Sequence, residues 1–269
     1  MEKDGYLSYR ILPTENDKPT FYWAATRLLD SFERFQEVNR LIGEAANGWQ
    51  SDIILRKDLD APADNHLEFD GVHSEQSELA MKLTTLVSEA IHHLRAALDY
   101  CAHHAAWMDS GKNWRYTYFP LLDDVKDWTS KRTTNAVRGI RSSHLEWVKE
   151  AQPFNGLRWP KLLRELSNQD KHRLALQILP AYSVTFDETE LIPDPKGEEG
   201  YAALSPVSRH LEILLKDPMV ESDTDDDDSN DNYIEVTGML WEMISGVTGV
   251  VNKFLAVEHL PPITITRQG

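Results

Sequence analysis

The chain has 269 residues, of which 41% are hydrophobic, and a formal net charge of −16. This apolar share suffices for a sizeable core, and we expect one domain covering residues 1–269. The single cysteine excludes an internal disulfide, and the sequence shows neither a signal peptide nor an apolar run of roughly 20 residues, so we expect a cytoplasmic protein with no membrane partner.

The first half of the chain predicts two long helices. A weakly alternating segment at 6–12 is a candidate edge strand. Apolar residues then follow helical spacing over 22–47, and the short apolar run 53–55 indicates a strand within a loop. Ser74, with acidic residues behind it, is a good start for a helix over 74–109. We expect this helix to be the spine of the fold.

The middle of the chain predicts shorter helices. Residues 123–150 form one or two of them, interrupted near Gly139 and stopped before Pro153. Pro160, at a first-turn position, begins a helix over 158–176. The apolar face of that helix consists of Trp159, Leu162, Leu163 and Leu166.

The last third of the chain changes character. Runs rich in β-branched and aromatic residues predict short strands at 174–179, 182–186, 210–215 and 233–236. An acidic stretch at 221–232 predicts a disordered loop, and helical spacing returns over 238–259. The expected fold is α+β and mainly helical, with a helical bundle mostly within 20–176. A small antiparallel sheet, the acidic loop and a C-terminal helix complete it within 177–269.

Charge is unevenly distributed along the chain. Residues 186–235 contain 16 acidic and 3 basic residues, whereas residues 126–173 contain 11 basic and 5 acidic residues. Oppositely charged faces can drive self-association or attract a partner of opposite charge. We therefore keep a homo-oligomer, a basic protein and RNA as candidate partners.

Two of the predicted helices carry charged residues that would need ion-pair partners if they were buried. Asp170 and Arg173 continue the apolar face of the 158–176 helix, and Arg95 and Asp99 lie four residues apart on the 74–109 helix. Charges on a core-facing stripe are costly unless they are paired. The sequence therefore predicts a buried ionic network that joins Arg95 to Asp170 and Asp99 to Arg173. The simpler alternative is an exposed pair of Arg95 with Asp99.

The sequence indicates neither a metal nor a cofactor. His92 and His103 share a helix face but lie about three turns, or roughly 16 Å, apart, which is too far for one ion. Cys101 falls on the apolar face of its helix, where a thiol is inert. The sequence contains no nucleophile elbow, phosphate-binding glycine loop or dinucleotide fingerprint. These absences argue against the common hydrolase, nucleoside-triphosphatase and dehydrogenase classes.

The basic part of the chain makes nucleic acid a candidate ligand. Basic residues there alternate with tryptophans, namely Trp128, Trp147 and Trp159 among Lys131, Arg132, Arg138, Arg141, Lys149, Arg158, Lys161 and Arg164. Basic groups bind phosphates, and aromatic rings stack on bases. The alternative is that these charges neutralise the acidic segment within the molecule or within a dimer.

Three motifs resemble those of a group of uncharacterised bacterial proteins. The motifs are His92-His93-Leu94-Arg95-Ala96-Ala97-Leu98-Asp99, Gln152-Pro153-Phe154 and Leu163-Arg164-Glu165-Leu166-Ser167-Asn168-Gln169-Asp170-Lys171-His172-Arg173. Members of the group carry similar Leu-Arg-x-Ala-Leu-Asp and Asn-x-Asp-Lys-His-Arg segments. The resemblance covers roughly residues 79–176 and implies no particular activity.

A more distant resemblance is to HEPN-type helical domains, many of which are metal-independent ribonucleases. Those domains use an arginine and a histidine four to six residues apart at a dimer interface. Arg138 and His144 match that spacing, so the resemblance implies that they are the first catalytic candidates, with His172 and Arg173 next. In such a site the histidine would act as general acid or base, and the arginine would stabilise phosphate charge.

Two functions therefore stand as hypotheses. The first is a non-catalytic binding or regulatory protein of the bacterial cytoplasm, which follows from the missing catalytic motifs and the separated charges. The second is a HEPN-like RNA-binding protein or metal-independent endoribonuclease in a defence or toxin system.

Overall fold

The structure is a computed structural model that describes residues 21–48, 53–58, 65–69, 73–171, 176, 178–193, 201–218 and 233–266. Several sequence predictions lie outside these described residues. They are the strand at 6–12, the acidic loop at 221–232, and the placement of His172 and Arg173.

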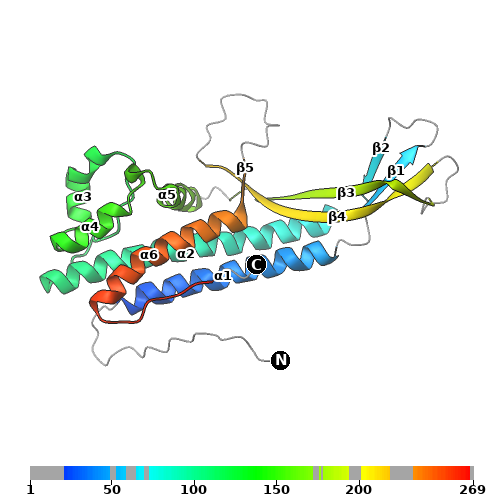
Figure 1. The fold of residues 1–269 in the computed structure, drawn as a ribbon. Coiled ribbons are helices and arrows are strands. Elements are labelled where there is room, and N and C mark those ends of the chain that lie inside the picture. Colours follow the sequence, from blue (N-terminus) through cyan, green and yellow to red (C-terminus); the bar gives the residue numbers. More distant parts are fainter. Residues whose placement is uncertain are drawn as a thin grey trace. The chain divides into compact units, whose positions relative to one another are not determined.

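The fold is α+β and mainly helical, with an antiparallel sheet and a C-terminal helix, as the sequence predicts. Figure 1 shows the helices α1 (Tyr22–Gly48), α2 (His73–Ser110), α3 (Lys131–Ala136), α4 (Ser142–Glu150), α5 (Arg158–Lys171) and α6 (Val236–Val257). Two short 3-10 helices, η1 (Val125–Thr129) and η2 (Pro153–Asn155), lie between them. The chain forms two compact units, one from residues 1–31, 92–164 and 243–269 and the other from 32–91 and 165–242.

Apolar periodicity explains the long helices. On α2 the buried side chains recur every three or four residues, at Leu83, Val87, Ala90, Ile91, Leu94, Leu98, Cys101 and Ala105. This confirms the predicted helix, and burial raises the pKa of the Cys101 thiol, as expected of an inert core cysteine. The predicted apolar face of α5 is buried as well, and so are the apolar residues that give α6 its helical spacing, Leu240, Ile244, Val247, Val251, Phe254 and Leu255.

The middle helices are shorter than the sequence predicts. The segment 123–150 divides into η1, α3 and α4, and the break falls at Gly139, whose φ of 90° is a left-handed conformation that glycine adopts without strain. The helix expected over 158–176 is described only to Lys171, and Leu176 lies outside any helix.

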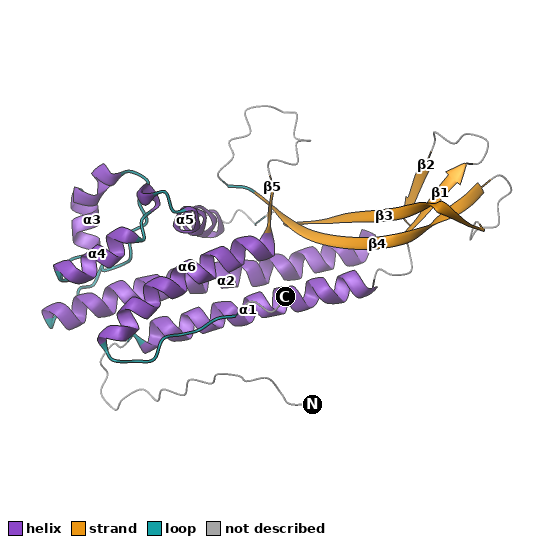
Figure 2. Ribbon diagram, viewed as in Figure 1, coloured by secondary structure: helices purple, strands orange, loops and turns teal. Residues whose placement is uncertain are grey.

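The sheet belongs to the second unit and has five antiparallel strands (Figure 2). They are β1 (Ile53–Asp58), β2 (Asn65–Phe69), β3 (Ile178–Pro193), β4 (Tyr201–Lys216) and β5 (Tyr233–Glu235). Strand β4 is central, because it pairs with β3 along one edge and with β1 and β5 at opposite ends of the other edge.

The sequence prediction of two strands at 174–179 and 182–186 is wrong, because a single strand, β3, runs through Pro180. Proline cannot donate a ladder hydrogen bond and is tolerated on edge strands. Among the described strands, β3 pairs with β4 alone, so it is an edge strand, and Pro180 lies opposite Ile213. The missing N–H of Pro180 is therefore compatible with the pairing of β3 with β4.

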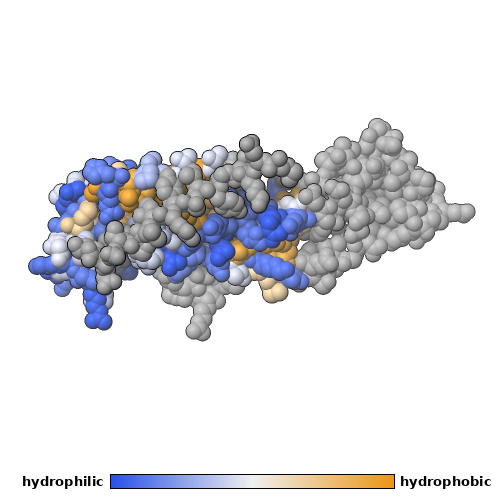
Figure 3. Space-filling model, turned by 90° about the horizontal axis from the view of Figure 1, so that it is seen from below, coloured by the Kyte–Doolittle hydropathy of each residue, from blue (hydrophilic) through white to orange (hydrophobic). Residues whose placement is uncertain are grey.

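No helix in the described part of the chain is both long enough and apolar enough to cross a membrane. Where it is described, the face drawn in Figure 3 mixes hydrophilic and hydrophobic residues.

A close contact between α6 and α5 makes Gly246 sensitive to substitution. A Cβ atom on Gly246 would lie 2.4 Å from the ring of Trp159, whereas a Cβ on Gly249 would meet nothing within 4 Å. We expect Gly246→Ala to lower the free energy of unfolding by about 1–3 kcal/mol through overpacking. Gly249→Ala, the matched control on the same helix, should raise it by about 0.5–1 kcal/mol through helix propensity. Urea denaturation of both variants tests this, and equal stabilisation by both would contradict the Trp159 contact.

Candidate functional site

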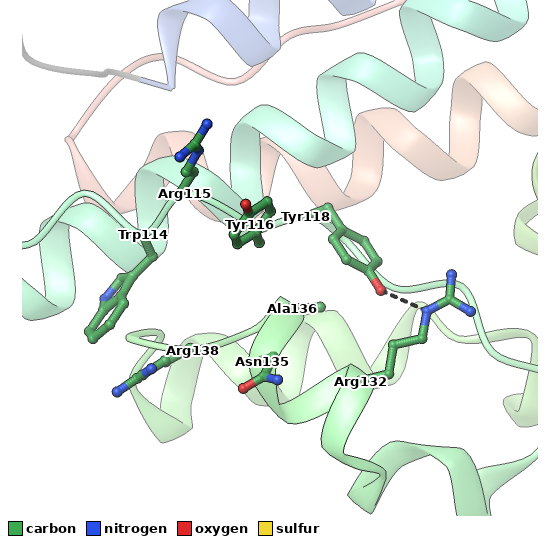
Figure 4. A pocket seen from close by; sticks show the side chains of 8 residues that line it. All are labelled: Trp114, Arg115, Tyr116, Tyr118, Arg132, Asn135, Ala136 and Arg138. Carbon is green, nitrogen blue, oxygen red and sulfur yellow. Dashed lines mark hydrogen bonds between the residues drawn. The ribbon is translucent and has the colours of Figure 1, made fainter.

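The first unit contains an open pocket between the segment that follows α2 and the helix α3. Its volume is about 560 Å³, and it is lined by Trp114, Arg115, Tyr116, Tyr118, Arg132, Asn135, Ala136 and Arg138 (Figure 4). Among the described residues, the lining contains three arginines, three aromatic rings and no carboxylate. This composition makes the pocket the strongest candidate for a functional site in the described residues.

The pocket arginines differ from other arginines of the same unit in lacking an acidic partner. Within the described part of the chain, Arg115, Arg132 and Arg138 form no ion pair. By contrast, four other arginines of this unit pair with aspartates, namely Arg27 with Asp30, Arg95 with Asp99, Arg141 with Asp109 and Arg164 with Asp123. The pocket therefore holds positive charge that no described carboxylate of the protein neutralises.

One wall of the pocket depends on the contact between Trp114 and the turn at Gly139. The indole N–H of Trp114 donates to Ser110 Oγ at 2.9 Å, which fixes the ring. A Cβ on Gly139 would lie 2.2 Å from the indole nitrogen, so only glycine allows this approach. The guanidinium carbon of Arg138 then lies 4.1 Å from the Trp114 ring centre, a cation–π contact that holds the charge at the pocket.

The opposite wall joins the 111–118 segment to α3. The backbone N–H of Tyr118 donates to the carbonyl of Ala136 at 3.1 Å, and Arg132 Nε donates to the Tyr118 hydroxyl at 3.3 Å. Figure 4 shows Tyr116 between these two groups, with Trp114 and Arg138 on one side and Tyr118 and Arg132 on the other.

Two charged residues of α2 bind the backbone of Phe119, the residue that follows the pocket-lining Tyr118. Arg95 Nη2 donates to the carbonyl of Phe119 at 2.5 Å, and the backbone N–H of Phe119 donates to Asp99 Oδ1 at 2.9 Å. Arg95 also pairs with Asp99 at 3.1 Å. The Leu-Arg-x-Ala-Leu-Asp motif therefore satisfies both backbone groups of one buried residue.

The other motifs bind the next residues of the same segment. The buried amide of Gln152 donates to the carbonyl of Pro120 at 2.9 Å and accepts from the N–H of Leu122 at 3.0 Å. Arg164, in the third motif, pairs with Asp123. Motif regions far apart in the sequence thus converge on the segment 119–123, which continues from the pocket wall.

The predicted network with Asp170 and Arg173 remains a prediction. The Asp170 side chain and all of Arg173 lie outside the described residues. What the described residues show is the intrahelical pair of Arg95 and Asp99, with Arg95 only 15% exposed.

His144, the first histidine candidate, lies in the interior. Its Nε2 accepts from Arg141 at 2.6 Å, and its Nδ1 lies 2.8 Å from Asp109 Oδ2. Because arginine can only donate, Nε2 must be unprotonated, and the neutral ring carries its proton on Nδ1 and donates it to Asp109. The ring is fully buried and packs against Trp147 and Phe254. Arg138, its proposed catalytic partner, lines the pocket.

His103 and His104, on the α2 helix, have structural surroundings. His104 is buried with Nε2 2.7 Å from Glu258 Oε1, and burial, together with the neighbouring His104, lowers the pKa of His103. Among the described residues, no three His, Cys, Asp or Glu side chains are grouped so that they could hold a metal ion. The three tryptophans of the basic stretch do not line the pocket.

Sequence reasoning missed the aromatic half of the pocket. The segment Trp114-Arg115-Tyr116-Thr117-Tyr118 interleaves aromatic and basic residues directly after the stop of α2. That pattern was a usable signal, because aromatic rings in a loop have no helix face to bury them. The basic half was partly found, since Arg132 and Arg138 belong to the predicted basic stretch.

Comparison with known proteins leaves the site to be interpreted from its own chemistry. No protein-family model, curated protein sequence or solved structure matches this chain.

Proposed function

We propose that this protein is a non-catalytic binding protein whose pocket takes a phosphate-bearing ligand. The observation that carries the proposal is the set of three pocket arginines without an ion pair in the described residues, beside three aromatic rings. A planar guanidinium matches the oxygens of a phosphate and can bind it through two hydrogen bonds. The pocket volume of about 560 Å³ lies within the range of small-ligand sites.

The surroundings of His144 favour binding over RNA cleavage at the Arg138–His144 pair. A general acid or base needs a ring nitrogen within hydrogen-bond reach of the substrate. Both ring nitrogens of His144 are hydrogen-bonded inside the protein, to Arg141 and Asp109. Because neither ring nitrogen is available to a substrate in this arrangement, the contacts favour a binding protein over an HEPN-like nuclease.

Two pocket arginines, Arg132 on α3 and Arg138 just after it, are replaced to test the proposal. We expect wild-type protein to bind at least one of three probes, inorganic tripolyphosphate, ATP without magnesium, or a single-stranded hexaribonucleotide, in calorimetry at 50 mM salt. The double variant Arg132→Gln/Arg138→Gln should weaken that binding by at least about tenfold, because it removes two charge-assisted contacts, each contributing up to about 1.5–3 kcal/mol. Binding should also weaken at 200 mM salt.

The matched control removes the same charge elsewhere. Lys126 and Lys161 are exposed, lie in the same unit and do not line the pocket. Lys126→Gln/Lys161→Gln should change the affinity by less than about threefold, because screened charges outside the site contribute little. No binding of any probe, or an equal loss in the control, would overturn the proposal.

A further inference from the structure

We infer that the pocket binds a nucleotide, either free or as one unit of single-stranded RNA, with the base stacked on Tyr116. This inference rests on the proposed function, because it names the ligand class of the same site. It adds base recognition to phosphate binding.

The first observation is an aromatic ring left open to the pocket. Tyr116 is 75% exposed, although large aromatic side chains are usually covered by the protein that carries them. The guanidinium carbon of Arg115 lies 5.8 Å from the centre of the Tyr116 ring. An exposed ring beside a basic group is the combination on which bases stack in single-strand binding sites.

The second observation separates the roles of the aromatic residues. The Trp114 ring is held by Ser110 and stacked on by Arg138, so it positions an arginine and is not the open platform. Tyr118 uses its hydroxyl to accept from Arg132. Tyr116 is therefore the lining ring whose described contacts leave room for a base.

The third observation is a polar group suited to a base edge. Asn135 lines the pocket from α3 and is exposed, and its side-chain amide makes no hydrogen bond with the described residues. A carboxamide offers both a donor and an acceptor, which matches the paired donor and acceptor of a base edge.

The arrangement of these groups fits one nucleotide. In Figure 4, Tyr116 lies between the Trp114 and Tyr118 sides of the pocket, and Asn135 lies on α3 between Arg138 on one side and Arg132 on the other. A base on Tyr116 would thus have a guanidinium on either side for its phosphates. Phosphate alone would use the arginines and leave Tyr116 and Asn135 without a role.

The decisive experiment compares ligands that share a triphosphate chain and differ in the nucleoside. We expect ATP without magnesium to bind wild-type protein at least fivefold more tightly than inorganic tripolyphosphate. Tyr116→Leu should weaken ATP binding by about fivefold to a hundredfold, the range of base–aromatic stacking, and leave tripolyphosphate binding unchanged. Tyr100→Leu removes another exposed tyrosine of the same unit, outside the pocket, and should change neither affinity.

The affinity for a third ligand, a single-stranded hexaadenylate RNA, shows whether the nucleotide is free or part of RNA. Tighter binding of the RNA than of ATP, still weakened by Tyr116→Leu, identifies RNA as the source, and the reverse order identifies a free nucleotide. Equal affinity for ATP and tripolyphosphate, or a Tyr116→Leu variant that binds both ATP and RNA as wild type does, would overturn the inference while the proposed function stands. Failure of all three ligands to bind would overturn the proposed function itself.

Discussion

Replacing His144 by alanine should lower the free energy of unfolding by about 3–5 kcal/mol, the range for removing a buried ring. The ring is fully buried between Trp147 and Phe254, so its loss leaves a cavity. The Asp109 carboxylate, whose side chain is 4% exposed, also loses the Nδ1–H donor at 2.8 Å. Urea denaturation followed by tryptophan fluorescence measures the effect.

The control for this variant is a histidine that the interior does not use. His92 is exposed on α2, and His92→Ala should change stability by no more than about 0.5 kcal/mol. If His144→Ala is as stable as wild type, the ring has no structural role and returns to the candidates for catalysis. The result therefore bears on both functional hypotheses.

Replacing Gln152 by leucine should lower the free energy of unfolding by about 3 kcal/mol. The substitution leaves buried backbone groups without hydrogen-bond partners, and each such group costs about 1–3 kcal/mol. Its amide bonds Pro120 and Leu122, and it also donates to the carbonyl of Val148 at 2.7 Å. Leucine fills a similar volume, so the loss comes from hydrogen bonds and not from a cavity. Thermal and urea unfolding of the purified variant measure it.

The same substitution at an exposed glutamine is the reference. Gln36 is exposed on α1, and Gln36→Leu should change stability by no more than about 0.5 kcal/mol. A Gln152→Leu protein within that limit would show that the segment 119–122 is held by other contacts. Arg95 and Asp99, which bind Phe119, would then be sufficient.

The motif residues show how far sequence reasoning reached for the site. Charged residues on a helix face indicated that Arg95 and Asp99 need partners, and the structure supplies the backbone of Phe119, twenty residues or more away along the chain. No side-chain pattern marks a backbone N–H or C=O as the partner, since every residue carries both. The role of the motif therefore required the tertiary structure.

His144 shows a limit of arguing from sequence spacing. The spacing from Arg138 suggested a pair, but spacing does not state which way a side chain points. On α4 the ring faces the core formed with α6, whereas Arg138 precedes Gly139 and reaches Trp114. The turn at Gly139 separates the two side chains into different environments.

The sequence by itself determined the long helices α1, α2 and α6, because their apolar residues recur with the helical period over many turns and local periodicity needs no distant partner. It also determined the mainly helical α+β class. Only the tertiary structure decided the course of β3 through Pro180, because an edge position is defined by which strand lies alongside. The pocket could be found only from the tertiary structure, since Tyr116 and Arg138 come to line the same cavity through the contact of Trp114 with Gly139. Contacts between residues so far apart depend on packing, which periodicity does not encode.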